Sequence, residues 1–351
     1  MKYYLKEEFL HDVNAKNAGN KARNDVESIV KEEGYHPLAF SVDNWYQMST
    51  LAAQRHKAKA FGQALDQLKQ GDELLIQFPM LHHSFFSTHL VKKAQKRGIR
   101  VYLLIHDLEV LRHANMTSLP LKHRIRMYLQ EASFLKAADG IIAHNPVMKS
   151  VLVDKGIAED KIVSLGIFDY LIPDFQEKTT QTKDQPIIVA GNLAQEKAGY
   201  LYKLPAETSY NLYGVGFDEN RALLNETYFG SFLPDELPSV LEGGFGLVWD
   251  GDSADTCSGV FGEYLRFNNS HKASLYLASG FPLVVWSQSA LSHFVLENDC
   301  GIVVESLHDI KTTIENLSES DYQGLVGNAK HIGKKIREGF YLTSALKKLT
   351  K

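Results

Sequence analysis

The sequence predicts an α/β protein of two lobes, each a parallel sheet with helices on both of its faces. Its 351 residues exceed what a single hydrophobic core usually organises. Short apolar runs alternate with segments of helical period in both halves of the chain, as in doubly wound sheets. The halves are separated by a polar stretch without a period, QEKTTQTKDQP at 176–186, which predicts a linker.

The first domain is expected to span residues 1–175. Its strands are expected at 1–5, 38–42, 73–79, 100–106, 140–144 and 161–167. The helices between them are expected at 20–33, 50–70, 85–97, 120–138 and 146–155. Turn residues such as Gly71 and Gly98 mark where helices end and strands begin.

The alternation restarts after the linker and predicts a second domain over residues 186–335. Its strands are expected at 186–191, 210–214, 227–232, 245–249, 282–286 and 301–306. Its helices are expected at 234–242, 269–279, 288–298, 308–317 and 321–350, the last broken near Gly339. Residues 336–351 would form a C-terminal helix that packs back on the first domain. Because doubly wound sheets bind ligands at the carboxyl ends of their strands, we expect the site in a cleft between the lobes.

The composition excludes several classes of protein. Apolar residues make up 44% of the chain and charged residues 23%, which argues against disorder. A formal net charge of −4 gives no support to nucleic-acid binding. Cys257 and Cys300 are the only cysteines, so neither a disulfide framework nor a cysteine metal site is predicted. The N-terminus lacks a signal-peptide pattern and no long apolar run occurs, which predicts a cytoplasmic protein.

The usual glycine-rich phosphate-binding motifs are absent from the sequence, which argues against NAD enzymes and P-loop NTPases. The first strand leads instead into a small polar loop, HDVNAKNAGNKAR at 11–23. There Asn17, Ala18 and Gly19 would let the backbone approach a ligand closely. The alternative is a plain helix N-terminus capped by Asn17 or Asn20.

A second candidate site begins at Asn268, Asn269 and Ser270, which are typical residues for the start of a helix. The first-turn amides and the helix dipole would suit a diphosphate. Lys272 adds a full positive charge in that same turn, where the dipole alone would disfavour a cation. The alternative is a solvated lysine beside a well-capped helix.

Several segments together resemble the GT-B glycosyltransferases. This group includes bacterial galactofuranosyltransferases and the glucosyltransferases that extend GlcNAc-primed serine-rich adhesins. The matching segments are NAGNKARNDVESIVKEEGY, IHDLEVLR, IVAGNL, GGFGLVWDG and YLRFNNSHKASLYLASGFPLVVW. The resemblance implies two Rossmann-like domains facing across a cleft, and a nucleoside-diphosphate sugar, UDP-linked, as the donor.

The resemblance also assigns donor-binding residues. Lys272 would bind the pyrophosphate beside the cap residue Asn269, and Tyr213 would contact the nucleoside end. The residues from Asn17 to Gly19, including Ala18, would close over the donor from the first lobe. Where some relatives have an arginine, this chain has Gln195, and Lys197 could replace its charge as a point charge.

For catalysis, acidic and histidine side chains stand at the end of the fourth predicted strand, in IHDLEVLR at 105–112. Transfer with inversion needs a base that takes the proton of the acceptor hydroxyl. Asp107 is the resemblance-backed candidate, with His106 beside it. The alternative is that Asp107 caps a turn and His106 is a core histidine. His82 and His83 follow the third strand and could line an acceptor pocket, with one of the two structural.

Asp250 and Asp252 have the spacing of a metal-chelating D-x-D pair. Asp-Gly is also an ordinary turn, and we favour that interpretation and a metal-independent reaction. Basic clusters at 122–130 and 331–340 could rest on anionic lipid as a peripheral membrane contact, or form solvated helix faces.

We therefore expect a bacterial hexosyltransferase that acts in protein glycosylation. It would move glucose or GlcNAc from a UDP-sugar to a GlcNAc-bearing glycan on a serine-rich adhesin, without a cofactor. The alternative is a galactofuranosyltransferase that uses UDP-galactofuranose in cell-wall or capsular polysaccharide synthesis. A UDP-sugar epimerase or a non-catalytic partner would be a different class. The expected partners are the UDP-sugar and a glycan or glycoprotein acceptor, with no nucleic acid, and the protein is expected to form a homo-oligomer.

Overall fold

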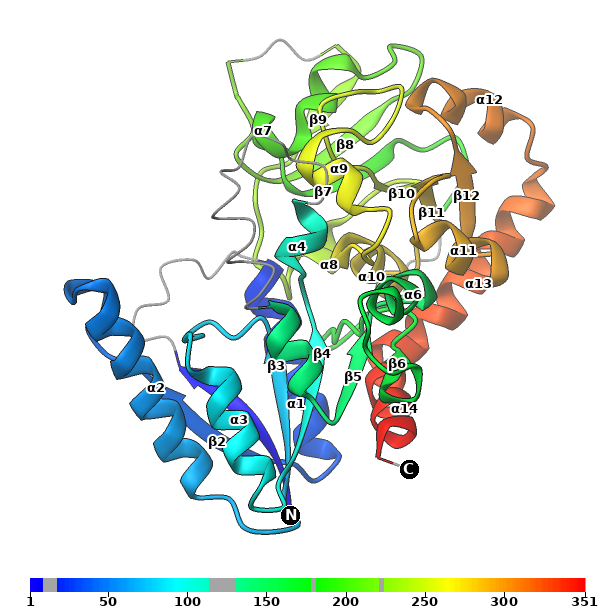
Figure 1. Ribbon diagram of the computed structural model, residues 1–351. Coiled ribbons are helices and arrows are strands. Elements are labelled where there is room, and N and C mark those ends of the chain that lie inside the picture. Colours follow the sequence, from blue (N-terminus) through cyan, green and yellow to red (C-terminus); the bar gives the residue numbers. More distant parts are fainter. Residues whose placement is uncertain (9–17, 114–130, 178–180, 221–223, 351) are drawn as a thin grey trace. The chain divides into compact units, whose positions relative to one another are not determined.

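The computed structural model describes the chain except for residues 9–17, 114–130, 178–180, 221–223 and 351. The chain divides into two compact units (Figure 1). The first unit comprises Met1–Asn14, Val26–Leu165 and Leu342–Lys351, and the second comprises Ala15–Asp25 and Gly166–Tyr341. Each unit contains a six-stranded parallel sheet, and every predicted strand is present.

In the first unit the strands lie in the order β2-β1-β3-β4-β5-β6. They span Lys2–Glu8 (β1), His36–Ser41 (β2), Glu73–Phe78 (β3), Arg100–Ile105 (β4), Gly140–Ala143 (β5) and Ile162–Ser164 (β6). The helices are Ala18–Glu32 (α1, in this unit from Val26 on), Thr50–Asp66 (α2), Ser87–Gln95 (α3), Glu109–Arg112 (α4), Pro146–Asp154 (α6) and Phe340–Leu349 (α14, in this unit from Leu342 on), with short 3₁₀ turns at Trp45–Gln47 (η1) and Glu159–Lys161 (η2). Residues 131–137 are helical as well. β3 is buried at all of its positions, as expected for a strand in the middle of a covered parallel sheet.

In the second unit the order is β12-β11-β10-β7-β8-β9. The strands span Ile187–Asn192 (β7), Tyr210–Val215 (β8), Glu226–Tyr228 (β9), Phe245–Val248 (β10), Leu283–Trp286 (β11) and Gly301–Val304 (β12). The helices are Gln195–Ala198 (α7), Leu237–Val240 (α8), Gly259–Tyr264 (α9), His271–Ala278 (α10), Leu291–Glu297 (α11), Ile310–Glu315 (α12) and Glu319–Arg337 (α13), with 3₁₀ turns at Gly199–Lys203 (η3) and Leu307–Asp309 (η4).

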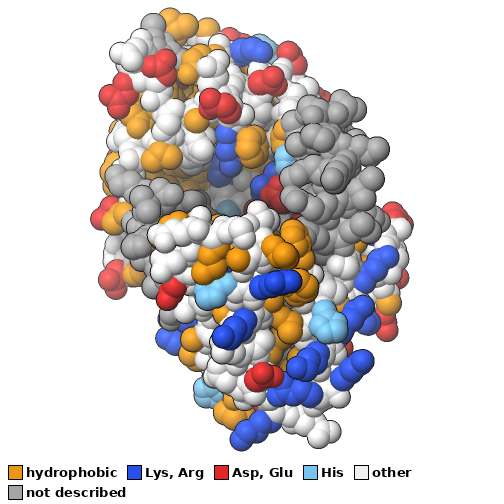
Figure 2. Space-filling model, turned by 60° about the vertical axis from the view of Figure 1, so that its left-hand side comes forward, with side chains coloured by type: hydrophobic (Ala, Val, Ile, Leu, Met, Phe, Trp, Pro, Cys, Tyr) orange, Lys and Arg blue, Asp and Glu red, His pale blue; other side chains and the backbone are white. Residues whose placement is uncertain are grey.

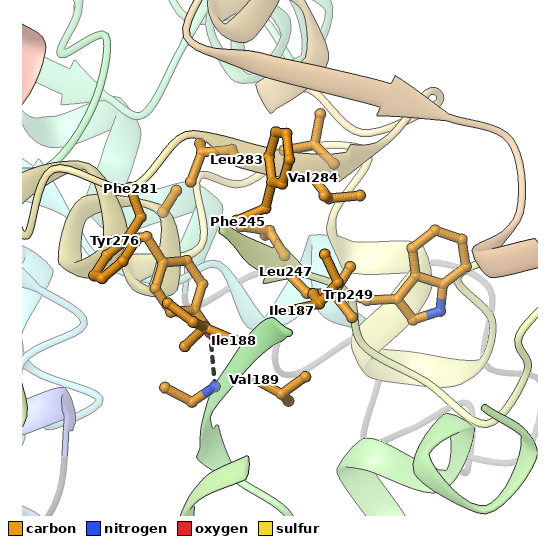
Figure 3. Close-up of a cluster of buried hydrophobic side chains, with 14 of the residues drawn as sticks. Ile187, Ile188, Val189, Phe245, Leu247, Trp249, Tyr276, Phe281, Leu283 and Val284 are labelled. Atoms are coloured by element: carbon orange, nitrogen blue, oxygen red, sulfur yellow. Dashed lines mark hydrogen bonds between the residues drawn. The ribbon is translucent and has the colours of Figure 1, made fainter. Parts of the chain in front are cut away.

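Tyr276 of α10 fastens that helix to the second sheet (Figure 3). Its ring is fully buried, and its hydroxyl accepts a 2.7 Å hydrogen bond from the backbone N–H of Ala190 in β7. A Cβ on Gly246 of β10 would lie 2.2 Å from this ring, so glycine lets the helix approach the strand closely. Phe245 and Leu247 of β10 are buried in the same core. This packing fixes the position of α10 on the sheet.

The division between the units differs from the predicted linker. The main segment of the second unit begins at Gly166, and the stretch at 176–186 belongs to it. Lys183 shows why, because its ammonium donates to the carbonyls of Ile314 (3.2 Å) and Leu317 (2.6 Å) at the end of α12. Lys183 thus contacts the second unit, which composition alone does not reveal.

Two further segments belong to a different unit from their neighbours in the sequence. Ala15–Asp25, at the start of α1, belongs to the second unit, although the prediction placed it in the first domain. α14 belongs to the first unit, where a Cβ on Gly140 would meet the side chain of Leu349 at 2.7 Å. The predicted break near Gly339 is confirmed, since this glycine has φ 69° between α13 and α14.

The helix predictions need smaller corrections. α8 covers only Leu237–Val240 of the expected 234–242, and the short helices α4, α7 and α9 were not predicted. Part of the expected helix at 120–138 lies outside the described residues. Both cysteines are buried and free. Within the part of the chain that the structure describes, no helix is both long and apolar enough to cross a membrane.

Candidate active site

The second unit carries a buried ion pair at the start of α10. The Lys272 ammonium donates to the Asp250 carboxylate at 2.9 Å and to the carbonyl of Trp249 at 2.7 Å. Both acceptors directly follow β10, and a Cβ on Gly191 of β7 would lie 3.7 Å from the Lys272 side chain. Lys272 therefore lies at the carboxyl ends of two neighbouring parallel strands, where doubly wound sheets bind ligands.

The Lys272 side chain is largely buried. Its side chain is 15% exposed and that of Asp250 is 9% exposed, so the pair is partly dehydrated. Burial lowers the pKa of Lys272, Asp250 opposes this shift, and the charge of Lys197 adds to it. The alternative of a solvated lysine therefore does not hold. Removing this lysine would leave a carboxylate with little access to water.

The N-cap residue of α10 does not bond the backbone amides of the first turn through its side chain. Ser270 occupies the N-cap position, but its side chain makes no capping hydrogen bond. Asn269, predicted as a cap and donor contact, is 3% exposed and donates to the carbonyl of Gly166 at 2.7 Å. Because the N-cap side chain makes no hydrogen bond to this turn, the amides and dipole of α10 are suited to an anion.

The predicted contacts Gln195 and Lys197 lie in α7, which follows β7. The Lys197 carbonyl accepts a 2.9 Å hydrogen bond from Gly251, so α7 is attached to the loop after β10. The Lys197 ammonium lies 5.4 Å from the ring centroid of Phe261 and acts on the pKa of Lys272. The structure thus brings Lys197 near Lys272, whereas Gln195 is exposed at the start of α7.

Asp250 and Asp252 have different surroundings. Asp250 pairs with Lys272, whereas Asp252 is exposed and accepts a hydrogen bond from the Ser258 hydroxyl. Gly251 between them has φ 110°, a conformation that favours glycine in a tight turn. This geometry agrees with the turn interpretation. Among the described residues, no group of three or more His, Cys, Asp or Glu side chains is placed to hold a metal ion.

Tyr213 takes a packing role. Its side chain is completely buried, its ring stacks on Phe229 with centroids 4.8 Å apart, and its hydroxyl accepts from the backbone N–H of Glu242 at 3.1 Å. Because side chains alternate between the faces of a strand, its position in β8 sends the ring into the core. A contact of Tyr213 with the nucleoside stays a prediction.

At the start of α1, Asn17 lies outside the described residues, and Ala18 and Gly19 are the first residues of the helix. The three were predicted to close over the donor from the first lobe. Ala18 and Gly19 belong to the second unit instead, together with Lys272. The donor contact itself stays a prediction.

In the first unit, the predicted base Asp107 follows β4. Its carboxylate forms a 2.6 Å ion pair with Arg112 of α4, and its side chain is 39% exposed. Arg112 is shared, because it also binds Glu109 at 2.6 Å. The imidazole Nε2 of His106 lies 2.8 Å from the side-chain oxygen of Gln77 in β3. Asp107 is thus oriented by a cation and partly accessible, as a base for an external hydroxyl must be.

Two residues that the sequence did not single out surround this segment. Glu131 accepts hydrogen bonds from the backbone N–H groups of Glu109 (2.8 Å) and Val110 (2.9 Å), which fixes the first turn of α4. Burial raises the pKa of Glu131 to about 7, although these hydrogen bonds oppose the shift. His144 after β5 is fully buried, and this burial lowers its pKa to about 4 although Asp107 opposes the shift.

His82 and His83 lie after β3 among aromatic rings. His82 is 7% exposed and meets Phe40 edge to face at 5.7 Å. His83 contacts Phe134 in the same manner at 5.4 Å, and burial, with the charge of Lys57, lowers its pKa to about 4. Contact of either histidine with the acceptor stays a prediction.

The structure describes only one of the two predicted basic clusters. Residues 122–130 lie outside the described part of the chain, and the apolar side of 331–340 is buried, with Ile332 and Ile336 in the core. Figure 2 shows lysine and arginine side chains gathered near exposed apolar ones in its lower half. In the first unit, the exposed residues of both kinds include Arg55, Lys59, Lys92, Lys93, Trp45, Tyr46, Phe85 and Phe86. Membrane contact and oligomer formation stay predictions.

The sequence matches known proteins along nearly its whole length. Residues 2–167 match the N-terminal domain, and residues 187–349 the C-terminal domain, of the family described as Glucosyltransferase 3-like. The chain is 33% identical to the beta-1,6-galactofuranosyltransferase WbbI of Escherichia coli K12, over 97% of each chain. It is 26% identical to glucosyltransferase 3 of Streptococcus gordonii, over 93% of this chain and 92% of that protein.

Solved structures show the same fold at low sequence identity. The sucrose-phosphate synthase of Thermosynechococcus elongatus matches with a TM-score of 0.66 at 14% identity, over 99% of this chain and 96% of that one. Anabaena HepE in complex with UDP-glucose matches with a TM-score of 0.54 at 11% identity, over 99% and 98%. Two parallel six-stranded sheets with their helices are the GT-B fold. The chain belongs to the Glucosyltransferase 3-like family and is a GT-B glycosyltransferase.

Proposed function

We propose that the protein transfers a hexose from a UDP-sugar to a carbohydrate hydroxyl. The observation that supports this most is the position of Lys272, which stands in the first turn of α10 at the carboxyl ends of β7 and β10. A diphosphate there would meet an ammonium, helix amides and the nearby charge of Lys197. The bound UDP-glucose of HepE, which has the same fold, is in keeping with this donor.

The reaction we propose proceeds with inversion. The acceptor oxygen forms a bond to the anomeric carbon while the bond from that carbon to the diphosphate oxygen breaks. The Asp107 carboxylate takes the hydroxyl proton, and the leaving UDP carries the negative charge that develops. Lys272 and the amides of α10 would stabilise this charge more strongly in the transition state than in the bound donor.

The acceptor we propose first is a GlcNAc-bearing glycan on a serine-rich adhesin, in keeping with membership of a family named after glucosyltransferase 3. A second candidate is galactofuranose transfer in polysaccharide synthesis. The observation that favours it is the 33% identity to WbbI, which exceeds the 26% identity to the S. gordonii enzyme. Membership of a glycosyltransferase family favours sugar transfer over the epimerisation of a UDP-sugar.

The donor can be identified with a panel of UDP-sugars. We expect UDP-glucose, UDP-GlcNAc or UDP-galactofuranose to raise the unfolding temperature of the protein, because a ligand that binds only the folded state stabilises it. The stabilising sugar is then incubated with acceptor glycans and the products are analysed. Transfer to GlcNAc would support the first candidate, and galactofuranosyl products the second. Interconversion of UDP-sugars in the absence of acceptor would contradict both.

We expect the reaction to be independent of divalent metal. Because Asp250 is engaged by Lys272 and Asp252 by Ser258, the two carboxylates do not converge on one ion. Treatment with EDTA should therefore leave the transfer rate largely intact, and Asp252→Ala should not alter any response to Mg²⁺ or Mn²⁺. A strict metal requirement that disappears in Asp252→Ala would refute the metal-free mechanism.

A further inference from the structure

The start of α1 is held in the second unit by a buried lysine. Lys21 is 7% exposed, and its ammonium donates to the carboxylates of Asp25 (2.8 Å) and Asp235 (2.7 Å) and to the carbonyl of Leu171 (2.7 Å). These three acceptors match the three N–H donors of an ammonium group. The cation also lies 4.9 Å from the ring centroid of Tyr170. Lys21 therefore connects α1 with residues 170–171 and 235.

Asp25, one helical turn after Lys21, completes this attachment. Its second carboxylate oxygen accepts a 3.0 Å hydrogen bond from the backbone N–H of Leu171. Lys21 and Asp25 thus bind the carbonyl and the N–H of the same residue. The Tyr170 hydroxyl donates to the carbonyl of Pro234 at 2.7 Å, which joins this segment to the loop that carries Asp235.

The segment 166–171 also holds the start of α10. Asn269 donates to the carbonyl of Gly166, and the imidazole of His271 is hydrogen bonded to the backbone of Asp169. The His271 ring lies 5.2 Å from Tyr170 and 6.0 Å from Phe168, measured between ring centroids. Burial, together with the charge of Lys21, lowers the pKa of His271 to about 4, so its ring packs in the neutral form.

We propose that Lys21 is a positioning residue for the donor diphosphate, which acts through the segment 166–171 to align the first turns of α1 and α10. The proposal rests on the donor site proposed above. Ala18 and Gly19 lie less than one turn before Lys21 on α1, and Lys272 directly follows His271 on α10. The two turns are about 250 residues apart in sequence, yet both belong to the second unit.

The charges of this cluster determine which variants can test the proposal. Burial raises the pKa of Asp25 to about 6; Lys21 and the Leu171 N–H oppose the shift, and Asp235 adds to it. Because the folded pKa lies above the ordinary value, Asp25 contributes stability at low pH that is lost as the pH rises through about 6. The other titratable groups around it are Lys21, Asp235, Tyr170 and His271.

Lys21→Met alone would leave the Asp25 carboxylate buried without its cation, and we expect it to destabilise the fold at neutral pH. The double variant Lys21→Met/Asp25→Asn removes both charges and should recover most of the lost stability. The matched control is Lys183→Met. Lys183 is another lysine of the second unit whose ammonium donates to several carbonyls, here those at the end of α12.

The test is calorimetric titration with UDP, together with the donor KM and kcat, well below the unfolding temperature of each variant. We expect the double variant to bind UDP about tenfold more weakly and to raise the donor KM more than it lowers kcat, since coupling through a packed segment is modest. Lys183→Met should lose stability and keep the affinity of the wild type.

Unaltered UDP affinity in a folded double variant would overturn the proposal, provided that Lys272→Ala binds UDP more weakly. If Lys272→Ala also binds UDP as the wild type does, the proposed donor site itself is wrong and the inference fails with it. An equal loss of affinity in Lys183→Met would show that UDP binding follows general stability, which also overturns the role of Lys21.

Discussion

Replacing Asp107 with asparagine is expected to lower kcat by roughly 10²–10⁴-fold, because a positioned general base contributes about this much to proton transfer. Affinity for the UDP-sugar should change little, since the donor contacts that we propose lie in the second unit. The fold should also be retained. Arg112 loses one partner but keeps its 2.6 Å ion pair with Glu109, and the Asp107 side chain is 39% exposed. Steady-state kinetics with saturating donor measure the effect.

The matched control for Asp107→Asn is Glu109→Gln. Glu109 binds the same arginine, has a similar exposure of 37%, and loses the same charge in the substitution. We expect Glu109→Gln to keep most of the wild-type turnover, because it orients Arg112 and takes no proton. Wild-type turnover in Asp107→Asn would exclude this carboxylate as the base. An equal fall in both variants would instead indicate that turnover depends on the charges around Arg112. His106 would then be the next candidate for the general base.

The strands of both sheets could be predicted because parallel strands are buried on both faces. LVVW in β11 is a continuous apolar run, ELLIQF in β3 is centred on the apolar residues 74–76, and both are bounded by turn residues, which leaves few alternatives. Short helices such as α7 could not be predicted, since Gln195–Ala198 is too short to show a period. It is held by a tertiary hydrogen bond from Gly251 to the Lys197 carbonyl.

Local sequence can indicate where a side chain of the candidate site stands, whereas distant partners decide its surroundings. Lys272 could be placed because cap residues and a strand surround it, yet its pairing with Asp250, 22 residues earlier, decides its burial. Tyr213 was assigned by resemblance, and the pleat of β8 sends its ring into the core. The pairing of Lys21 with Leu171 spans 150 residues, and no local pattern could indicate it.

Replacing Lys272 with alanine is expected to weaken UDP binding by roughly 10- to 150-fold, which corresponds to the 1.5–3 kcal/mol of a charge-assisted hydrogen bond. Among the described residues, Asp250 and Trp249 supply the partners of the ammonium, and its third N–H is available for a phosphate oxygen. The transfer rate should fall further than the affinity, because negative charge on the departing diphosphate grows in the transition state. Calorimetric titration with UDP and single-turnover kinetics separate the two effects.

Lys272→Ala should also lower stability, by roughly 3 kcal/mol, because it leaves Asp250 with little access to water and no cation. The double variant Lys272→Ala/Asp250→Asn removes that carboxylate charge, so we expect it to recover stability while UDP binding stays weak. Lys203→Ala is the control for charge, since Lys203 is an exposed cation near Asp252 and is not part of the proposed site. If the double variant is as stable as the wild type and binds UDP equally well, the diphosphate must lie elsewhere. If instead only the two Lys272 variants lose UDP affinity, the loss reports the missing ammonium, because neither the stability nor the net charge of the region accounts for it.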